Sequence, residues 1–245
     1  MYLSHLLINV GTNPDRPRPG RVWLRNRYRV HQRLCMAFPS DGRKADDPHF
    51  LKPYVANDFA GTDVHVVRNA DAGFLYRVDI LPSGRVVILV QSPREPDWGY
   101  AFHNADYLLA AAPEVRPYRA KWAAGQTARF RLQANVTRKV RTKTGEDGKR
   151  KNGARVPVER ERLVEWLQRK GQDSGFFVSE PAVHCQTGYV YFHKDSTEDG
   201  RLFSVVYDGV LTIADGAAFA GAITTGIGPA KAFGFGLLTA VALQE

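Results

Sequence analysis

Apolar residues in the first half of the chain follow two spacings, and each spacing predicts one type of element. Residues 2–10 are mainly aliphatic and β-branched, as in a strand. In residues 26–38 an apolar side chain recurs at every fourth position, which predicts an amphipathic helix capped by Asn26. Between them, residues 13–21 are rich in proline and arginine, so we expect a loop there.

The same half continues with a pair of strands and a second helix. Residues 74–81 and 85–92 are typical of two strands joined by a short turn that contains Gly84. We expect a helix over residues 104–112 and a last strand over residues 114–121. The resulting order of strand, helix, strand, strand, helix and strand is that of the ferredoxin-like fold.

The second half repeats this order of elements without repeating the residues. A strand, a helix, two strands, a helix and a last strand are expected at residues 126–135, 160–170, 182–193, 201–213, 216–224 and 235–243. Asp215 is expected to cap the second of these helices. We therefore predict an α+β protein with two tandem ferredoxin-like (RRM-like) βαββαβ domains and antiparallel sheets, with limits at residues 1–121 and 122–245.

The charge balance narrows the class of partner. The chain has 34 basic and 25 acidic residues and a formal net charge of +9, which favours an anionic partner, usually a nucleic acid. Charge alone does not choose among RNA, DNA and a membrane surface. The two cysteines lie far apart, so we expect a reducing compartment and no disulfide framework. The sequence has neither a long apolar span nor the positively charged start of a signal peptide, so we expect a cytoplasmic protein without membrane contact.

Most of the excess positive charge lies in residues 136–155, which we call the basic loop. The loop contains eight basic and two acidic residues, so its net charge is +6 (8 − 2). The basic residues are Arg138, Lys139, Arg141, Lys143, Lys149, Arg150, Lys151 and Arg155. Asp147 and Gly148 could form the tip of a hairpin. Charged runs are often only solvated loops, but this density favours phosphate binding, and the lack of aromatic residues favours contact with a duplex backbone over base stacking.

A second distinctive stretch, residues 226–238 (GIGPAKAFGFGLL), precedes the last expected strand, and we call it the glycine loop. Its candidate RNA-binding residues are Gly226, Gly228, Lys231, Gly234 and Gly236. The spacing matches neither a Walker loop nor a dinucleotide-binding fingerprint. Two interpretations stay open. The N–H groups could form a nest for a phosphate beside the lysine, or the stretch could be a tight turn before a buried strand.

The helix expected at residues 26–38 carries the candidate chemistry. Tyr28 and His31 are three positions apart and share a face of the helix, with Arg27 and Arg33 close by. RNA supplies its own nucleophile, the 2′-hydroxyl, so a histidine assisted by a phenol or a cation could cleave RNA without a metal. The histidines and cysteines show no metal-ligand spacing, so we expect no metal and no cofactor. A Tyr-x-x-His pair on a basic helix is also common without catalysis.

Together with short sequence motifs, these features resemble the CasE family, the CRISPR RNA-processing endoribonucleases of type I-E systems. The motifs are Met-Tyr-Leu-Ser at the start, Tyr-Arg-Val-His-Gln from Tyr28, and the glycine loop. The family's Ala-Asn-Pro-Thr block before a basic loop is Ala-Asn-Val-Thr here, from Ala134. The resemblance covers essentially the whole chain.

This resemblance implies two tandem ferredoxin-like domains and an endoribonuclease that binds the stem-loop of the CRISPR repeat transcript. Family members cut at the base of the stem without a metal, through attack of the 2′-hydroxyl, which leaves a 2′,3′-cyclic phosphate and a 5′-hydroxyl. They usually stay on the RNA, first pre-crRNA and then crRNA, beside the other subunits of the Cascade complex. The family's histidine and tyrosine correspond to His31 and Tyr28, and its glycine loop lies near the RNA.

One departure from the family concerns a lysine that follows the histidine by one helical turn. Cys35 and Met36 stand there instead, which leaves Arg33, Arg27 or Lys231 to stabilise the transition state. Two other functions remain open on the sequence alone. The chain could be a non-catalytic RNA-hairpin-binding module of a ribonucleoprotein complex, or a protein-binding subunit whose basic face meets an acidic partner.

Overall fold

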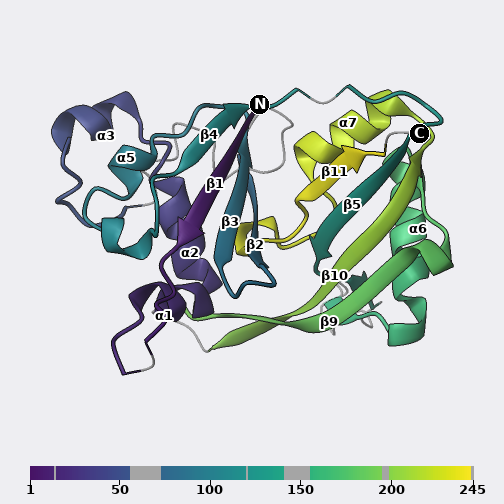
Figure 1. Ribbon diagram of the computed structural model, residues 1–245, viewed down its shortest axis with the longest axis horizontal. Coiled ribbons are helices and arrows are strands. Elements are labelled where there is room, and N and C mark those ends of the chain that lie inside the picture. Colours follow the sequence, from purple (N-terminus) through teal and green to yellow (C-terminus); the bar gives the residue numbers. More distant parts are fainter. Residues whose placement is uncertain (14, 56–72, 120, 141–154, 195–198, 244–245) are drawn as a thin grey trace, which may run out of the picture.

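The first sheet consists of four antiparallel strands in the spatial order β2-β3-β1-β4 (Figure 1). Their bounds are Tyr2–Ile8 (β1), Leu75–Ile80 (β2), Val86–Ser92 (β3) and Glu114–Pro117 (β4). The structure is a computed structural model that describes residues 1–13, 15–55, 73–119, 121–140, 155–194 and 199–243. All four expected strands are present, with somewhat shorter limits than the sequence pattern suggested.

Helices pack against one face of this sheet. They are α1 (Pro19–Arg25), α2 (Arg27–Cys35), α3 (Asp41–Asp46), α5 (Trp98–Ala101) and the 3₁₀ helix η1 (Asp106–Leu108). The apolar side of α2 places Val30 and Leu34, both fully buried, in the core with Leu6 of β1. Asn26 caps α2 as predicted, because its side-chain oxygen accepts a hydrogen bond from the N–H of Tyr28 at 3.1 Å.

The second half forms a sheet in the order β11-β5-β10-β8, with β9 also paired to β10. The strands are Thr127–Ala134 (β5), Phe176–Phe177 (β8), Val183–Phe192 (β9), Gly200–Ile213 (β10) and Leu238–Ala242 (β11). The helices are α6 (Leu163–Asp173) and α7 (Gly216–Thr225), with 3₁₀ turns η2 (Arg160–Arg162), η3 (Glu180–Ala182) and η4 (Lys231–Phe233). Asp215 caps α7, as expected.

Both sheets have the same topology. β1 lies between β3 and β4 in the first sheet, and β5 lies between β10 and β11 in the second, which is the ferredoxin-like arrangement. The prediction of an α+β protein with two tandem ferredoxin-like units is therefore confirmed. The first sheet ends at Pro117 and the second begins at Thr127, and the expected domain limit at residue 121 falls between them and stays a prediction.

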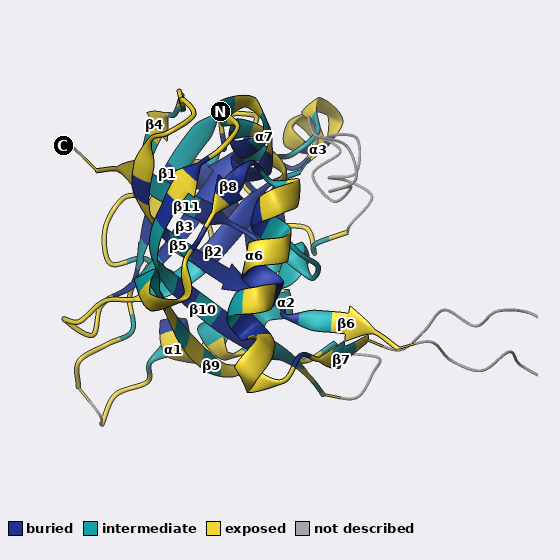
Figure 2. Cartoon of the chain, turned by 90° about the vertical axis from the view of Figure 1, so that its right-hand side faces the viewer, coloured by how far each residue is buried: buried dark blue, intermediate teal, exposed yellow. Residues whose placement is uncertain are grey.

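A small two-stranded sheet marks the base of the basic loop. Its strands are Thr137–Lys139 (β6) and Arg155–Pro157 (β7), and they extend away from the body of the protein (Figure 2). Residues 141–154 lie outside the described residues, and so does the hairpin tip expected at Asp147 and Gly148.

Two predictions for the first half are wrong. The helix expected over residues 104–112 is replaced by α5 and η1, because the side chain of Asp97 accepts a hydrogen bond from the N–H of Tyr100 at 2.9 Å and starts a helix earlier. The loop expected over residues 13–21 ends early, because Pro19 begins α1. Proline suits the first helical position, where its missing N–H would have no helical partner.

The faces of the two sheets that α2 and α7 leave uncovered lie toward each other (Figure 1). Leu75 and Leu89 of the first sheet meet Leu237, next to β11, in a small buried cluster. The amide of Gln91 donates a hydrogen bond to the carbonyl of Ile223 in α7 at 2.7 Å. The two halves therefore share apolar and polar contacts and form one structure.

Arg77 on β2 is the central polar contact between the halves. Its Nη1 donates hydrogen bonds to the carbonyl oxygens of Arg131 (3.1 Å) and Leu237 (3.2 Å) and to the hydroxyl of Thr239 (3.0 Å). Its Nε and Nη2 bind the carboxylate of Asp79 at 2.8 to 3.0 Å. With only 4% of its surface exposed, this guanidinium has its charge balanced and its donors occupied.

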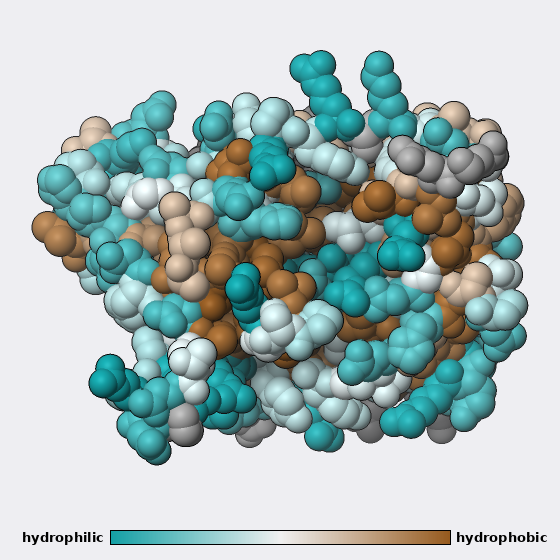
Figure 3. All heavy atoms as spheres, viewed as in Figure 1, coloured by the Kyte–Doolittle hydropathy of each residue, from teal (hydrophilic) through white to brown (hydrophobic). Residues whose placement is uncertain are grey.

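The surface reflects this arrangement. On the face of Figure 3, hydrophobic residues gather over the first sheet and again over the second, and hydrophilic residues lie between these groups and along the lower edge near α1 and β9. In the part of the chain that the structure describes, no helix combines the length and apolar character that a membrane span needs.

We expect Arg77→Met to lower the free energy of unfolding by about 3 kcal/mol, because it leaves Asp79 and three acceptors of the second half without a buried donor. Urea denaturation followed by circular dichroism measures this. Arg85→Met is the matched control, since Arg85 is exposed beside the same sheet. Equal stability of the two variants would contradict the role given to Arg77.

Candidate functional site

Segments that are far apart in the sequence meet at α2, which carries Tyr28 and His31. The helix contacts η4, within the glycine loop, and β9 of the second sheet. Figure 1 shows the hairpin of β9 and β10 running below both sheets to the region of α1 and α2. The predicted catalytic helix therefore lies at the junction of the two halves.

His31 is half-buried on the side of α2 that faces β2. Its ring lies 5.4 Å from the ring of Phe74 and 6.4 Å from that of Tyr76, centroid to centroid. Nδ1 is buried, and Nε2 is 3.6 Å from the Sγ of Cys35. Burial raises the pKa of the Cys35 thiol to about 12, so the sulfur next to the imidazole is neutral at neutral pH.

Tyr28 is paired with a cation from the second half. Nζ of Lys194 lies 5.3 Å from the centroid of the Tyr28 ring, a cation–π distance. Asn26 holds the two segments together, because its amide donates to the carbonyl of His193 at 3.0 Å and its oxygen accepts from the N–H of His193 at 3.1 Å. The same side chain thus caps α2 and fixes the end of β9.

Tyr76 joins the start of α2 to the glycine loop. Its buried hydroxyl lies 3.2 Å from the carbonyl of Arg27 and 3.1 Å from that of Ala232. A Cβ at Gly234 would lie 3.0 Å from the Tyr76 ring, at a backbone angle φ of +86°. Only glycine takes this conformation readily and lets the loop approach β2 so closely.

The glycine loop is first of all a packing element. The N–H groups of Gly226, Gly234 and Gly236 donate to carbonyls of Ala222 (2.8 Å), Lys231 (3.1 Å) and Gln133 (2.8 Å). These three amides are therefore not available to the phosphate nest that was one interpretation of the sequence. Binding of RNA by the four glycines stays a prediction that rests on the position of the loop beside α2.

Lys231, Arg33 and Arg27 were the candidate cations, and the structure gives each a different setting. Lys231 donates from Nζ to the carbonyl of Thr225, and burial lowers the pKa of its ammonium group. Arg33 donates to the carbonyl of Ala101 at 2.9 Å and to the side chain of Asn104 at 3.0 Å. Both side chains therefore hold the fold together in this structure.

Arg27 has a more unusual environment. Its Nη1 is buried and has no hydrogen-bond partner among the described residues. Burial lowers the pKa of the guanidinium, and the charges of Tyr76 and Asp79 oppose this shift. Its place at the start of α2, next to Tyr28, keeps Arg27 among the candidates for RNA contact.

Of the basic loop, the structure describes Arg138, Lys139 and Arg155. All three are exposed on β6 and β7, and Arg138 forms an ion pair with Glu159 at 3.4 Å. The remaining predicted contacts, Arg141, Lys143, Lys149, Arg150 and Lys151, lie outside the described residues. The described part thus keeps a positively charged hairpin base that α2 does not cover.

Lys194 is the residue that the sequence pattern missed. It follows β9, outside the basic loop and the glycine loop, and no motif marks it. Only the pairing of β9 with β10 and the path of their hairpin toward α2 bring it to Tyr28. A contact between residues this far apart in the chain leaves no periodicity to detect.

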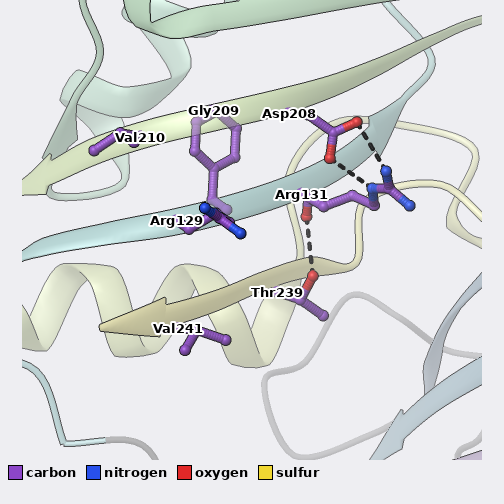
Figure 4. A pocket seen from close by; sticks show the side chains of 8 residues that line it. Arg129, Arg131, Asp208, Gly209, Val210, Thr239 and Val241 are labelled. Atoms are coloured by element: carbon purple, nitrogen blue, oxygen red, sulfur yellow. Dashed lines mark hydrogen bonds and ion pairs between the residues drawn. The ribbon is translucent and has the colours of Figure 1, made fainter. Parts of the chain in front are cut away.

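A hollow on the second sheet is a less suitable site. Figure 4 shows it lined by Arg129, Arg131, Asp208, Val210, Thr239 and Val241. Arg131 is bound to Asp208 at 2.6 Å, and the carboxylate raises the pKa of the guanidinium. Arg131 and Asp208 are thus already paired with each other. Among the described residues, no group of three or more metal-ligating side chains gathers anywhere.

Known proteins resemble this chain in sequence. The sequence profile of a family described as CRISPR associated protein matches residues 1–241. The CRISPR-associated endoribonuclease Cse3 of Thermus thermophilus is 32% identical over 163 residues, which span 62% of this chain and 72% of that protein. The Cascade subunit CasE of Escherichia coli K12 is 28% identical over 244 residues, 98% of each chain.

Solved structures agree with these sequence matches. A structure of the endoribonuclease Cse3 bound to a 19-nucleotide RNA is similar, with a TM-score of 0.65 and 26% identity over 98% of both chains. The crystal structure of Cas6e from Escherichia coli K-12 has a TM-score of 0.62 and 25% identity, and covers 99% of this chain and 100% of that one. The likeness extends over both halves of the fold.

Proposed function

Because the chain belongs to the CasE family of CRISPR-associated proteins, we propose that it is an endoribonuclease that processes CRISPR RNA. It binds the stem-loop of the repeat transcript, cuts at the base of the stem, and stays bound as a subunit of Cascade. A cytoplasmic location and domains at residues 1–121 and 122–245 belong to this proposal.

The observation that carries the proposal is the position of Tyr28 and His31. They lie on one helix, at the junction where the glycine loop and the end of β9 meet α2. Lys194 brings a positive charge to the same place. A phenol, an imidazole and a cation can supply the proton transfers and the charge stabilisation that metal-free RNA cleavage requires.

The reaction needs two proton transfers and one site of charge stabilisation. The 2′-hydroxyl gives its proton to a base while its oxygen bonds to phosphorus, and the bond from phosphorus to the 5′-oxygen of the next nucleotide breaks. That 5′-oxygen takes up a proton. The products are a 2′,3′-cyclic phosphate and a 5′-hydroxyl, and the nucleophile comes from the substrate, so no metal is needed to generate it.

We assign a proton transfer to His31. Nε2 is the ring nitrogen for this role, because Nδ1 is buried. The thiol of Cys35 is 3.6 Å from Nε2 and neutral at neutral pH, so it places no charge next to the imidazole. Tyr28 lies one helical turn before His31, where its hydroxyl can orient the scissile phosphate or protonate the leaving oxygen.

Lys194 is the cation that we assign to the negative charge of the transition state. Lys231 and Arg33 are each bound to backbone carbonyls of the fold. Lys194 instead lies over the Tyr28 ring, and among the described residues this ring is the contact that the structure gives its ammonium group, so its N–H donors can reach a phosphate oxygen. It thus takes the place of the family lysine that this chain lacks on α2.

A non-catalytic RNA-hairpin-binding module is the second candidate function. The observation in its favour is the half-buried imidazole, which packs against Phe74 and Tyr76 as a structural histidine would. Both candidate functions include RNA binding, so a binding measurement does not distinguish them. A cleavage measurement distinguishes them.

We expect His31→Ala to cut a labelled repeat hairpin at least about a hundredfold more slowly than the wild type, with unchanged hairpin affinity. The experiment measures single-turnover cleavage in EDTA and affinity by fluorescence anisotropy. His5→Ala is the matched control, because His5 is exposed on β1, on the face opposite to the neighbouring Leu6 that packs with α2. Wild-type cleavage that requires added magnesium would refute the metal-free mechanism, and wild-type binding without any cleavage would favour the second candidate function.

For Lys194→Met we expect a single-turnover rate about tenfold to a hundredfold below that of the wild type, since one charge on the transition state is lost. The dissociation constant of the hairpin should change little. Lys194→Arg should recover part of the rate, whereas Lys121→Met, at an exposed lysine elsewhere, should have no effect. A weaker affinity with an unchanged rate would instead make Lys194 a binding residue.

The basic loop should set the salt dependence of RNA binding. In the triple variant Arg138→Gln, Lys139→Gln and Arg155→Gln, affinity should fall, and the slope of log Kd against log salt should decrease by about one for each phosphate that the protein no longer neutralises. Arg116→Gln on β4 is the control, since this exposed arginine is paired with Glu114. An unchanged slope would favour the interpretation in which the basic face meets an acidic protein.

A further inference from the structure

The hairpin of β9 and β10 carries exposed aromatic side chains that the proposed site does not use. Tyr189 and Tyr191 are 48% and 57% exposed. They are two positions apart on β9, so both point to the same face of the sheet. Arg201 stands opposite Tyr191 on β10, and Phe203 stands opposite Tyr189. We call these four side chains the aromatic platform.

The platform is already organised without a ligand. The guanidinium carbon of Arg201 lies 4.8 Å from the centroid of the Tyr189 ring, and the rings of Tyr189 and Phe203 are 6.0 Å apart at 64°. Phe203 is partly buried and packs against the hydrophobic core of the second half. The aromatic side chains that remain exposed are therefore held by a hydrogen-bonded strand pair and by one anchored neighbour.

The platform lies between the two parts of the proposed RNA site. At one end, the side chain of Asn135, just before β6, donates a hydrogen bond to the carbonyl of Phe203 at 2.7 Å. At the other end, β9 leads from Tyr191 directly to Lys194 beside Tyr28. RNA that spans from the basic hairpin to α2 would pass this face.

We propose that the aromatic platform binds unpaired nucleotides that flank the RNA hairpin, one base on each exposed tyrosine ring. The inference rests on the proposed function, because it takes the hairpin from there. Every base offers a flat face to an aromatic ring, so such stacking tolerates any flank sequence. Arg201 already lies over the Tyr189 ring and adds a cation–π contribution to the stack.

RNA affinity that comes from stacking should respond to salt differently from affinity that comes from charge. Around the end of this hairpin, among the described residues, the basic residues Lys194 and Arg201 are accompanied by the acidic residue Asp199. Asp199 forms an ion pair with His193. Because the local charge is mixed, the contribution of the platform should come from the rings and depend weakly on salt, unlike that of the basic loop.

The test compares a bare repeat hairpin with the same hairpin carrying unpaired nucleotides at its 5′ or its 3′ end, by fluorescence anisotropy at two salt concentrations. The wild type should bind one of the flanked hairpins more tightly than the bare one. In the double variant Tyr189→Ala and Tyr191→Ala this advantage should fall about tenfold or disappear at both salt concentrations. Affinity for the bare hairpin should not change.

Two controls show that the rings are responsible. The double variant Tyr189→Phe and Tyr191→Phe keeps the aromatic faces and should retain the advantage. Phe177→Ala removes another exposed aromatic residue, 58% exposed on β8, which pairs with the far end of β10, and should behave as the wild type. A flank of abasic sugars should bind no better than no flank.

Equal wild-type affinity for flanked and bare hairpins, or an undiminished advantage in the alanine variant, would overturn the platform proposal. An alanine variant that keeps its RNA affinity but assembles poorly with Cascade subunits would likewise overturn it and make the face a protein interface. If the wild type binds no hairpin, the proposed function fails, and an unpaired oligonucleotide then tests the platform directly against its abasic counterpart.

Discussion

Two neighbouring residues of β2, Tyr76 and Arg77, determine how the halves of this protein sit against each other. Successive side chains of a strand point to opposite faces, so one turns toward α2 and the glycine loop and the other toward the second sheet. Tyr76 meets the carbonyls of Arg27 and Ala232, and Arg77 meets acceptors on β5 and next to and within β11. The chain before β11 thus wraps around the edge strand of the first sheet and is bound on both of its faces.

The candidate site depends on these contacts of Tyr76 and Arg77, because its residues come from both halves of the chain. Tyr28 and His31 come from the first half, and Lys194 and the glycine loop come from the second. Asn26 adds a second tie by capping α2 and binding His193. Shifts of about 1 Å are enough to cost a reaction much of its rate, so a site shared between two units needs fixed contacts at more than one point.

The sequence could predict the features that depend on residues close together in the chain, but not those that depend on residues far apart. The helix with Val30 and Leu34 inside, the strand pairs and the cap at Asp215 rest on neighbours within a few residues, and all are confirmed. The roles of Arg77 and Lys194 rest on partners far along the chain, and no spacing reveals them. The glycine loop shows the limit most clearly, since its composition fits a phosphate nest and a close turn equally well, and only the partners of its N–H groups separate the two.

The half-buried His31 sets a condition on catalysis. Its ring packs against Phe74 in the free protein, so the RNA has to be held with Nε2 next to one 2′-hydroxyl, and contacts remote from the scissile bond must supply that free energy. In the proposed function, the basic loop and the aromatic platform would be such contacts. Because neither would touch the bond that breaks, both would hold the cut RNA as firmly as the uncut RNA, and release of the product would be slow. Under this proposal, tight retention of the RNA follows directly from how the substrate is positioned.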